Sequence, residues 1–171
     1  MRVIVDNCAV DRFAAAGIDP VADLHGTELQ LVYTPDLRKE YEAALASANT
    51  HSGVKNLIKK ILDGGSPYGF FGFGGGPCLG FDQGIWASAD QVQAIDSIPP
   101  KPRKNGLPGR RTDAHLIALS KSAVVITDNW RETHWKNVPG AWMVVQWSEF
   151  ERILRREGNT ADAIRCVLQL G

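Results

Sequence analysis

The sequence VVITD at residues 124–128 decides the fold. Its first three residues are β-branched and apolar, and such a short apolar run predicts a strand buried on both faces, as in a parallel sheet. The chain begins in the same way, with RVIV at residues 2–5 followed by Asp6. Ligands of open α/β sheets bind beyond the carboxyl ends of the strands, so Asp6 and Asp128 predict a shared acidic site. The alternative is that each aspartate only caps a strand or starts a turn.

The remaining hydrophobic periodicity predicts an alternation of helices and strands. A strand is expected at 30–33, and Thr34-Pro35 is a typical helix start, with threonine at the N-cap. The other expected elements are helices at 9–16, 35–48, 54–62, 88–98, 113–120, 149–156 and 161–170 and a strand at 142–145. This order predicts a three-layer α/β/α fold, in which a central parallel sheet carries helices on both faces. A length of 171 residues is typical of a single domain.

Composition excludes several classes of protein. The net charge is zero and 44% of residues are apolar, as in an ordinary globular domain. The three cysteines are far apart and have no zinc-ligand spacing, so neither a disulfide framework nor a zinc site is predicted. No apolar run resembles a membrane span, and the N-terminus lacks the apolar core of a signal peptide. These features favour a reducing cytoplasm.

Two further acids fall on the packing sides of predicted helices. At about 100° per residue, Glu40 lies at the edge of its helix's apolar face, whereas Glu42 lies well outside that face. Thr112 is expected to cap the next helix, which places Asp113 in its first turn on the packing side and points His115 away. A buried acid needs a partner, so Glu40 and Asp113 are functional candidates. The alternative for Glu40 is that its side chain snorkels to solvent or pairs with a lysine.

The segment at about 64–111 reads as an insertion with two parts. Residues 64–84 are dense in glycine and aromatic residues and predict a loop or flap, because no phosphate-loop motif is present. Residues 99–111 carry basic residues and no acid, so a local phosphate-binding patch is predicted, with a solvated linker as the alternative. The basic residues are Lys101, Arg103, Lys104, Arg110 and Arg111.

The order of the acids resembles the PIN domain family, metal-dependent nucleases that include toxin ribonucleases of bacterial toxin–antitoxin pairs. The resemblance covers roughly residues 1–63 and 110–155 and includes WSEFERIL at 147–154. It implies that Mg²⁺ or Mn²⁺ is bound by the four acids, with Asn7 as a polar substrate-binding neighbour. These acids are Asp6, Glu40, Asp113 and Asp128. The chain is longer than a compact toxin of this kind, mainly through the insertion.

The chemistry of these residues agrees with the resemblance. Carboxylate oxygens suit Mg²⁺, and bound metal can supply both a nucleophile and charge stabilisation for phosphodiester cleavage. We therefore expect an endoribonuclease acting on RNA. The alternatives are a catalytically silent module that binds RNA or protein, and a nucleotide-binding protein using the Gly-rich loop. The sequence leaves open whether the substrate is DNA or RNA and which RNA is the target. It also leaves open whether an antitoxin partner exists, whether the protein is a homodimer, and how many metals bind.

Other reactive side chains are expected to have structural roles. Cys8 lacks an evident histidine base and is interpreted as a core thiol rather than a nucleophile. The four histidines show no metal-ligand spacing and are interpreted as structural or solvated.

Overall fold

The computed structural model describes residues 1–71, 84–99, 101, 107, 109–129, 133–138 and 142–170. Among these residues, five parallel strands form a central sheet in the order β3-β2-β1-β6-β7. Their bounds are Arg2–Val5 (β1), Gln30–Tyr33 (β2), Ser66–Pro67 (β3), Ala123–Thr127 (β6) and Val144–Gln146 (β7). The predicted α/β class and parallel sheet are confirmed.

The two apolar stretches that suggested the fold are the central pair of strands. All five residues of β6 are buried, as are the last three of β1. The two strands pair in parallel, with Val5 opposite Ile126. Each strand has a neighbour on both sides and helices above and below, which explains why both sequences are continuously apolar rather than alternating.

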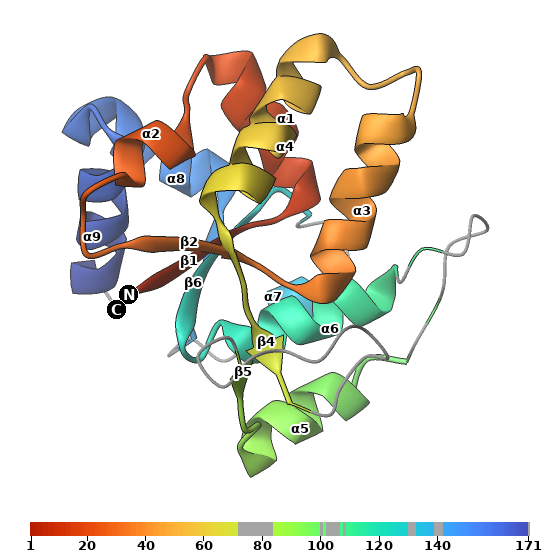
Figure 1. The fold of residues 1–171 in the computed structure, drawn as a ribbon. Helices are drawn as coiled ribbons and strands as arrows, with labels where there is room; N and C mark the ends of the chain where they lie inside the picture. Colours follow the sequence, from red (N-terminus) through yellow and green to blue (C-terminus); the bar gives the residue numbers. More distant parts are fainter. Residues whose placement is uncertain are drawn as a thin grey trace.

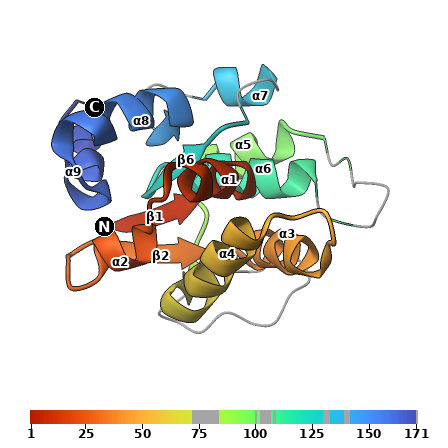
Figure 2. The same cartoon turned by 90° about the horizontal axis from the view of Figure 1, so that it is seen from above.

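Helices cover both faces of the sheet (Figures 1 and 2). Helices α1, α4 and α8 lie on one face, where Phe13 of α1 packs against Trp147 and Phe150 of α8. Helices α5 and α6 lie on the other face. The helix bounds are Asn7–Ala16 (α1), Pro20–Leu24 (α2), Pro35–Ala46 (α3), Ser52–Gly64 (α4), Ala89–Asp96 (α5), Arg110–Leu119 (α6), Thr133–Lys136 (α7), Trp147–Glu157 (α8) and Thr160–Leu170 (α9).

Local sequence signals fix the helix that carries Glu40. Thr34 is the N-cap of α3, and its hydroxyl accepts a hydrogen bond from the backbone N–H of Leu37 at 3.0 Å. Pro35 occupies the first helical position, where its missing N–H has no cost. The predicted start of this helix is therefore confirmed, and it sets the rotation that turns Glu40 inward.

The predicted starts of helix α6 and strand β7 are wrong. Helix α6 begins at Arg110 rather than after Thr112, because Gly109 is its N-cap with a φ of 56°, which glycine adopts readily. Thr112 therefore lies inside the first turn. Strand β7 spans Val144–Gln146 rather than 142–145, since its register is set by pairing with β6, where Val125 lies opposite Val144.

The Gly-rich segment has ordered ends. Ser66 and Pro67 form β3 beside β2, and Phe70 is buried in the short strand β4 (Gly69–Phe70), which pairs with β5 (Gly84–Ile85). The expectation of a loop or flap over all of 64–84 is therefore wrong at both ends, where backbone pairing and an aromatic side chain hold the chain. Residues 72–83, including Phe73 and the glycine run at 74–76, lie outside the described residues.

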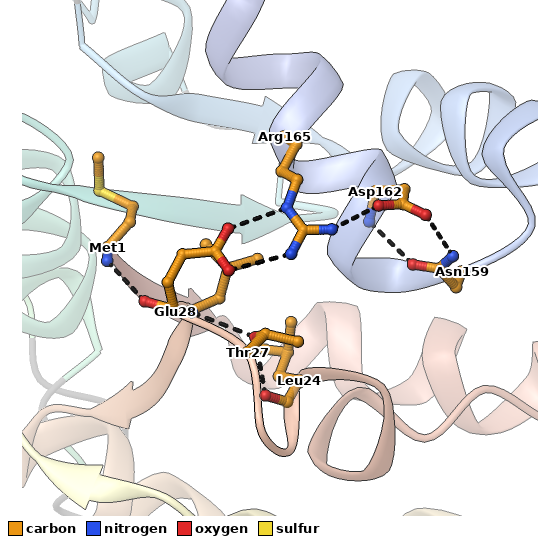
Figure 3. A network of polar contacts seen from close by, with 8 residues as sticks. Met1, Leu24, Thr27, Glu28, Asn159, Asp162 and Arg165 are labelled. Atoms are coloured by element: carbon orange, nitrogen blue, oxygen red, sulfur yellow. Dashed lines mark hydrogen bonds and ion pairs between the residues drawn. The ribbon is translucent and has the colours of Figure 1, made fainter.

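A polar network closes the N-terminal edge of the sheet (Figure 3). The guanidinium of Arg165 on α9 makes two hydrogen bonds to the Glu28 carboxylate, at 2.9 and 3.0 Å, and a third to Asp162. The amino group of Met1 donates to the carbonyl of Glu28. The C-terminal helix is thus attached to the start of the sheet.

Across the described part of the chain, every helix is too short or too polar to cross a membrane.

Candidate active site

The sheet has a switch point between β1 and β6. From β1 the chain adds β2 and then β3 on one side, and it returns to place β6 and β7 on the other. Ligands of such sheets bind outside the carboxyl ends of the strands at this point. Asp6 directly follows β1 and Asp128 directly follows β6, so both predicted aspartates lie at the switch point.

The Asp6 carboxylate is held between the two central strands. Its side chain is buried, and the residue is 5% exposed. One oxygen, Oδ1, accepts the backbone N–H of Asn7 at 2.7 Å and so caps α1. The other, Oδ2, accepts the hydroxyl of Thr127 at 2.7 Å and the thiol of Cys8 at 2.9 Å. These contacts fix the carboxylate and supply the partners that a buried charge requires.

Cys8 links the two aspartates. Its sulfur lies 2.9 Å from Asp6 Oδ2 and accepts the backbone N–H of Asp128 at 3.2 Å. Burial, followed by the charge of Asp6, raises the pKa of the Cys8 thiol far above its usual range. A thiol that stays protonated is a poor nucleophile. The geometry therefore agrees with the structural role expected for Cys8, at a position beside the acids.

Asp128 pairs with a residue that sequence reasoning missed. The Arg12 Nε donates to Asp128 Oδ2 at 2.8 Å, and the side chains are 56% and 26% exposed respectively. Arg12 lies on α1, which follows β1 and packs over β6. The two residues are 116 positions apart in sequence, so only the strand order could have indicated their contact.

Glu40 is brought to the same edge of the sheet by its neighbour Tyr41. The Tyr41 hydroxyl donates to the carbonyl of Val5, the last residue of β1. Burial, then the charges of Asp6, Cys8 and Glu40, raise the pKa of Tyr41 well above its usual value. Glu40 itself is 4% exposed, and its Oε1 accepts the hydroxyl of Thr112 at 2.7 Å.

This placement confirms the predicted contrast between the two glutamates of α3. Glu40 is buried, whereas Glu42 is exposed and pairs with Arg38 on the surface at 2.8 Å. Thr112 of α6 donates a hydrogen bond to Glu40, which gives this buried carboxylate a neutral partner. The hydrogen bond also joins α3 to α6 one residue before Asp113.

Asp113 contacts a histidine that the sequence did not indicate. The Nε2 of His134, on α7, lies 3.1 Å from Asp113 Oδ2, and the two side chains are mostly buried. The interpretation of His134 as merely structural or solvated missed this contact. The two residues are 21 positions apart, with β6 between them, and no spacing rule links them.

Asp36 of α3 is another buried acid that sequence reasoning missed, and it joins α3 to α6. Arg111 of α6 makes two hydrogen bonds to it, from Nε at 2.9 Å and Nη2 at 2.8 Å. The Nδ1 of His115 lies 3.4 Å from Asp36 Oδ2, and Lys39 Nζ lies 3.6 Å from Oδ1. Burial would raise the pKa of Asp36, but hydrogen bonds from His115 and Arg111 lower it to about 2.

Two expectations about α6 change as a result. His115 is buried rather than pointing away, because α6 also packs against α3, where Arg111 and His115, one helical turn apart, both reach Asp36. Arg111, which was expected to contact phosphate, donates two of its N–H groups to Asp36. Lys101 is exposed and Arg110 begins α6, while Arg103 and Lys104 lie outside the described residues. Binding of phosphate by this basic group stays a prediction.

The donor set fits a hard divalent cation in its chemistry. Carboxylate oxygens from Asp6, Glu40, Asp113 and Asp128 are the ligands that Mg²⁺ and Mn²⁺ take in proteins. Within the described residues, no three His, Cys, Asp or Glu side chains are grouped closely enough to hold a metal ion. Instead each acid has a protein partner. Asp6 is bound by Thr127 and Cys8, and Glu40 by Thr112. Asp113 contacts His134, and Asp128 pairs with Arg12.

No protein-family model and no curated protein matches this sequence. Among solved structures, the chain is similar to one of VapBC2 from Rickettsia felis bound to a DNA fragment from their promoter. The TM-score is 0.48 and the sequence identity 13%, over 86% of this chain and 99% of that chain.

Proposed function

We propose that this protein is a metal-dependent nuclease that cleaves RNA phosphodiester bonds. The observation that carries the proposal is the position of Asp6 and Asp128 at the carboxyl ends of the two central strands, on either side of the switch point. Two separate helices, α3 and α6, bring Glu40 and Asp113 toward that edge and are joined there by the Thr112 hydroxyl. The resemblance of the acid order to the PIN family supports the same reading.

Asp6, Glu40, Asp113 and Asp128 are the residues that would hold Mg²⁺ or Mn²⁺. When bound, the metal lowers the pKa of a coordinated water and stabilises charge on the phosphate. The chain's own residues fix the carboxylates: Thr127 orients Asp6, Thr112 orients Glu40 and His134 orients Asp113. Such outer partners commonly set the orientation of metal ligands. Asn7 and the basic residues before α6 are proposed to contact the RNA.

Arg12 has a separate role in this proposal. Its guanidinium neutralises Asp128 and is more than half exposed. Arginine forms planar, two-pronged contacts with phosphate as readily as with carboxylate. Arg12 would therefore leave Asp128 available to hold the cation and would itself contact the phosphate of the substrate.

A catalytically silent module that binds RNA or protein is the second candidate. It is favoured by the pairs Arg12–Asp128 and His134–Asp113, which give two of the acids a partner without a metal ion. The toxin role, with a cognate antitoxin, is a narrower form of the first proposal. A small upstream reading frame encoding a DNA-binding protein would favour it.

The test is cleavage of single-stranded RNA with Mg²⁺ or Mn²⁺, with and without EDTA. Asp113→Asn keeps the size of the side chain but removes its charge, so cleavage should fall by orders of magnitude while the protein stays folded. Glu42→Gln is the matched control, because this exposed glutamate pairs with Arg38 on the surface. Cleavage by the wild type in EDTA, or full activity of Asp113→Asn, would refute the proposal. Metal binding by a folded wild type without cleavage of RNA or DNA would favour the silent module.

A further inference from the structure

A cavity adjoins the candidate active site on the side of α5, α6 and α7. Its volume is about 520 Å³, which is within the usual range for small-molecule pockets. His134 forms part of its wall, and the same histidine contacts Asp113 at 3.1 Å. His134 therefore connects the cavity to Asp113, one of the four acids, and a base bound in the cavity would carry its attached phosphate toward the site.

The lining of the cavity suits a flat, uncharged ring with polar edges. Its apolar part includes Ile117 of α6, and the indole of Trp142 offers an aromatic surface. Gln93 on α5 and Asn137 after α7 place exposed amides on two different elements around it. An amide both donates and accepts hydrogen bonds, which is what the edge of a nucleobase requires.

Charge argues against a phosphate in the same cavity. No lysine or arginine is among the described residues that line it. The acid of the lining, Asp90, is paired with Lys121, and His134 is occupied with Asp113. Among the described lining residues a phosphate would meet no unpaired lysine or arginine, whereas a neutral ring would cover apolar surface and keep its edges paired.

We propose that this cavity binds one unpaired base of single-stranded RNA, with the attached sugar-phosphate directed toward Asp113. The inference rests on the proposed RNA substrate and adds to it a site that reads the base. Double-stranded RNA keeps its bases stacked inside the helix, so the cavity selects single strands. Stacking and edge contacts for one base correspond to about tenfold in affinity or more.

The experiment measures binding in EDTA, where metal-dependent cleavage is blocked. The probes are fluorescently labelled single-stranded RNAs of one sequence in which a single abasic nucleotide is moved along the chain. For the wild type, the abasic nucleotide should weaken binding about tenfold at one position and little elsewhere. The double variant Gln93→Ala with Asn137→Ala should bind the parent RNA more weakly and lose this position effect. Both residues are exposed, so the fold should be kept.

The matched control is Asn56→Ala with Gln169→Ala, which removes the same two amides from exposed positions on α4 and α9. It should retain the position effect. Ser97→Trp, which fills the cavity from its exposed rim, should abolish the effect while circular dichroism shows a folded protein. A wild type without any position effect, or a double variant that keeps it, overturns the base site.

The result separates this inference from the proposed function. If the protein cleaves RNA but binds all the abasic RNAs equally well, the base site is refuted and the nuclease is not. A position effect without any metal-dependent cleavage refutes the nuclease and leaves the base site as the property of an RNA-binding module.

Discussion

The buried carboxylate of Asp36 gives the sharpest prediction about stability. Asp36 is 2% exposed and joins α3 to Arg111 and His115 of α6. Its pKa of about 2, against an ordinary value of 3.8, makes the charged form about 2.5 kcal/mol more favourable in the folded state, at about 1.4 kcal/mol per pKa unit. Asp36→Asn should therefore cost about 2.5 kcal/mol of unfolding free energy at pH 7. Urea unfolding followed by circular dichroism measures it.

The dependence on pH follows from the sign of the shift. The folded pKa lies below the unfolded one, so this stabilisation is present above pH 4 and is lost as pH falls from about 4 to about 2. The difference between wild type and Asp36→Asn should shrink to about 1.3 kcal/mol near pH 3. Glu42→Gln, which breaks an exposed pair, should change stability by about 0.5 kcal/mol or less. A cost for Asp36→Asn no larger than this control, or one that is constant with pH, would refute the reasoning.

Two further predictions concern charge around the candidate site. Replacing both Lys101 and Arg110 by alanine should reduce the slope of log affinity against log salt for single-stranded RNA by about 1.4, at about 0.7 per phosphate contact. Fluorescence binding at several salt concentrations measures this slope. An unchanged slope would mean that the basic segment is a solvated linker. Arg12→Ala removes the cation that pairs with Asp128, so Mn²⁺ should bind more tightly in calorimetry; weaker binding would mean that Arg12 orders the site rather than competing for it.

The central fold followed from the sequence because its signals are local. The apolar runs that end in Asp6 and Asp128 mark the two inner strands, and Thr34-Pro35 sets the start of α3 and hence the inward turn of Glu40. Burial on both faces leaves a continuous apolar run, which needs no knowledge of the partners. The contrast between Glu40 and Glu42 is a matter of helical rotation alone.

The partners of the acids depend on tertiary contacts and could not be predicted in this way. Arg12, His134 and Asp36 meet their partners across many intervening residues. The burial of His115 follows from the packing of α6 against α3, and Arg111 belongs to α6 because the helix starts at Gly109, where a positive φ replaces the expected side-chain cap. An unusual backbone conformation at one glycine leaves no clear signal in hydrophobic periodicity, so the first turn of α6 was misplaced and the contact with Asp36 was missed.

Titration of Mn²⁺ into the folded protein by calorimetry tests the central claim most directly, because the nuclease reading requires the acids at the switch point to bind a divalent cation. The wild type and Glu42→Gln should bind Mn²⁺ alike and melt at a higher temperature with the metal, through mass action on the folded state. Asp128→Asn should bind much more weakly, since it loses one of the carboxylates. Absence of binding to the folded wild type at millimolar Mn²⁺, or equal binding by Asp128→Asn, would contradict the account.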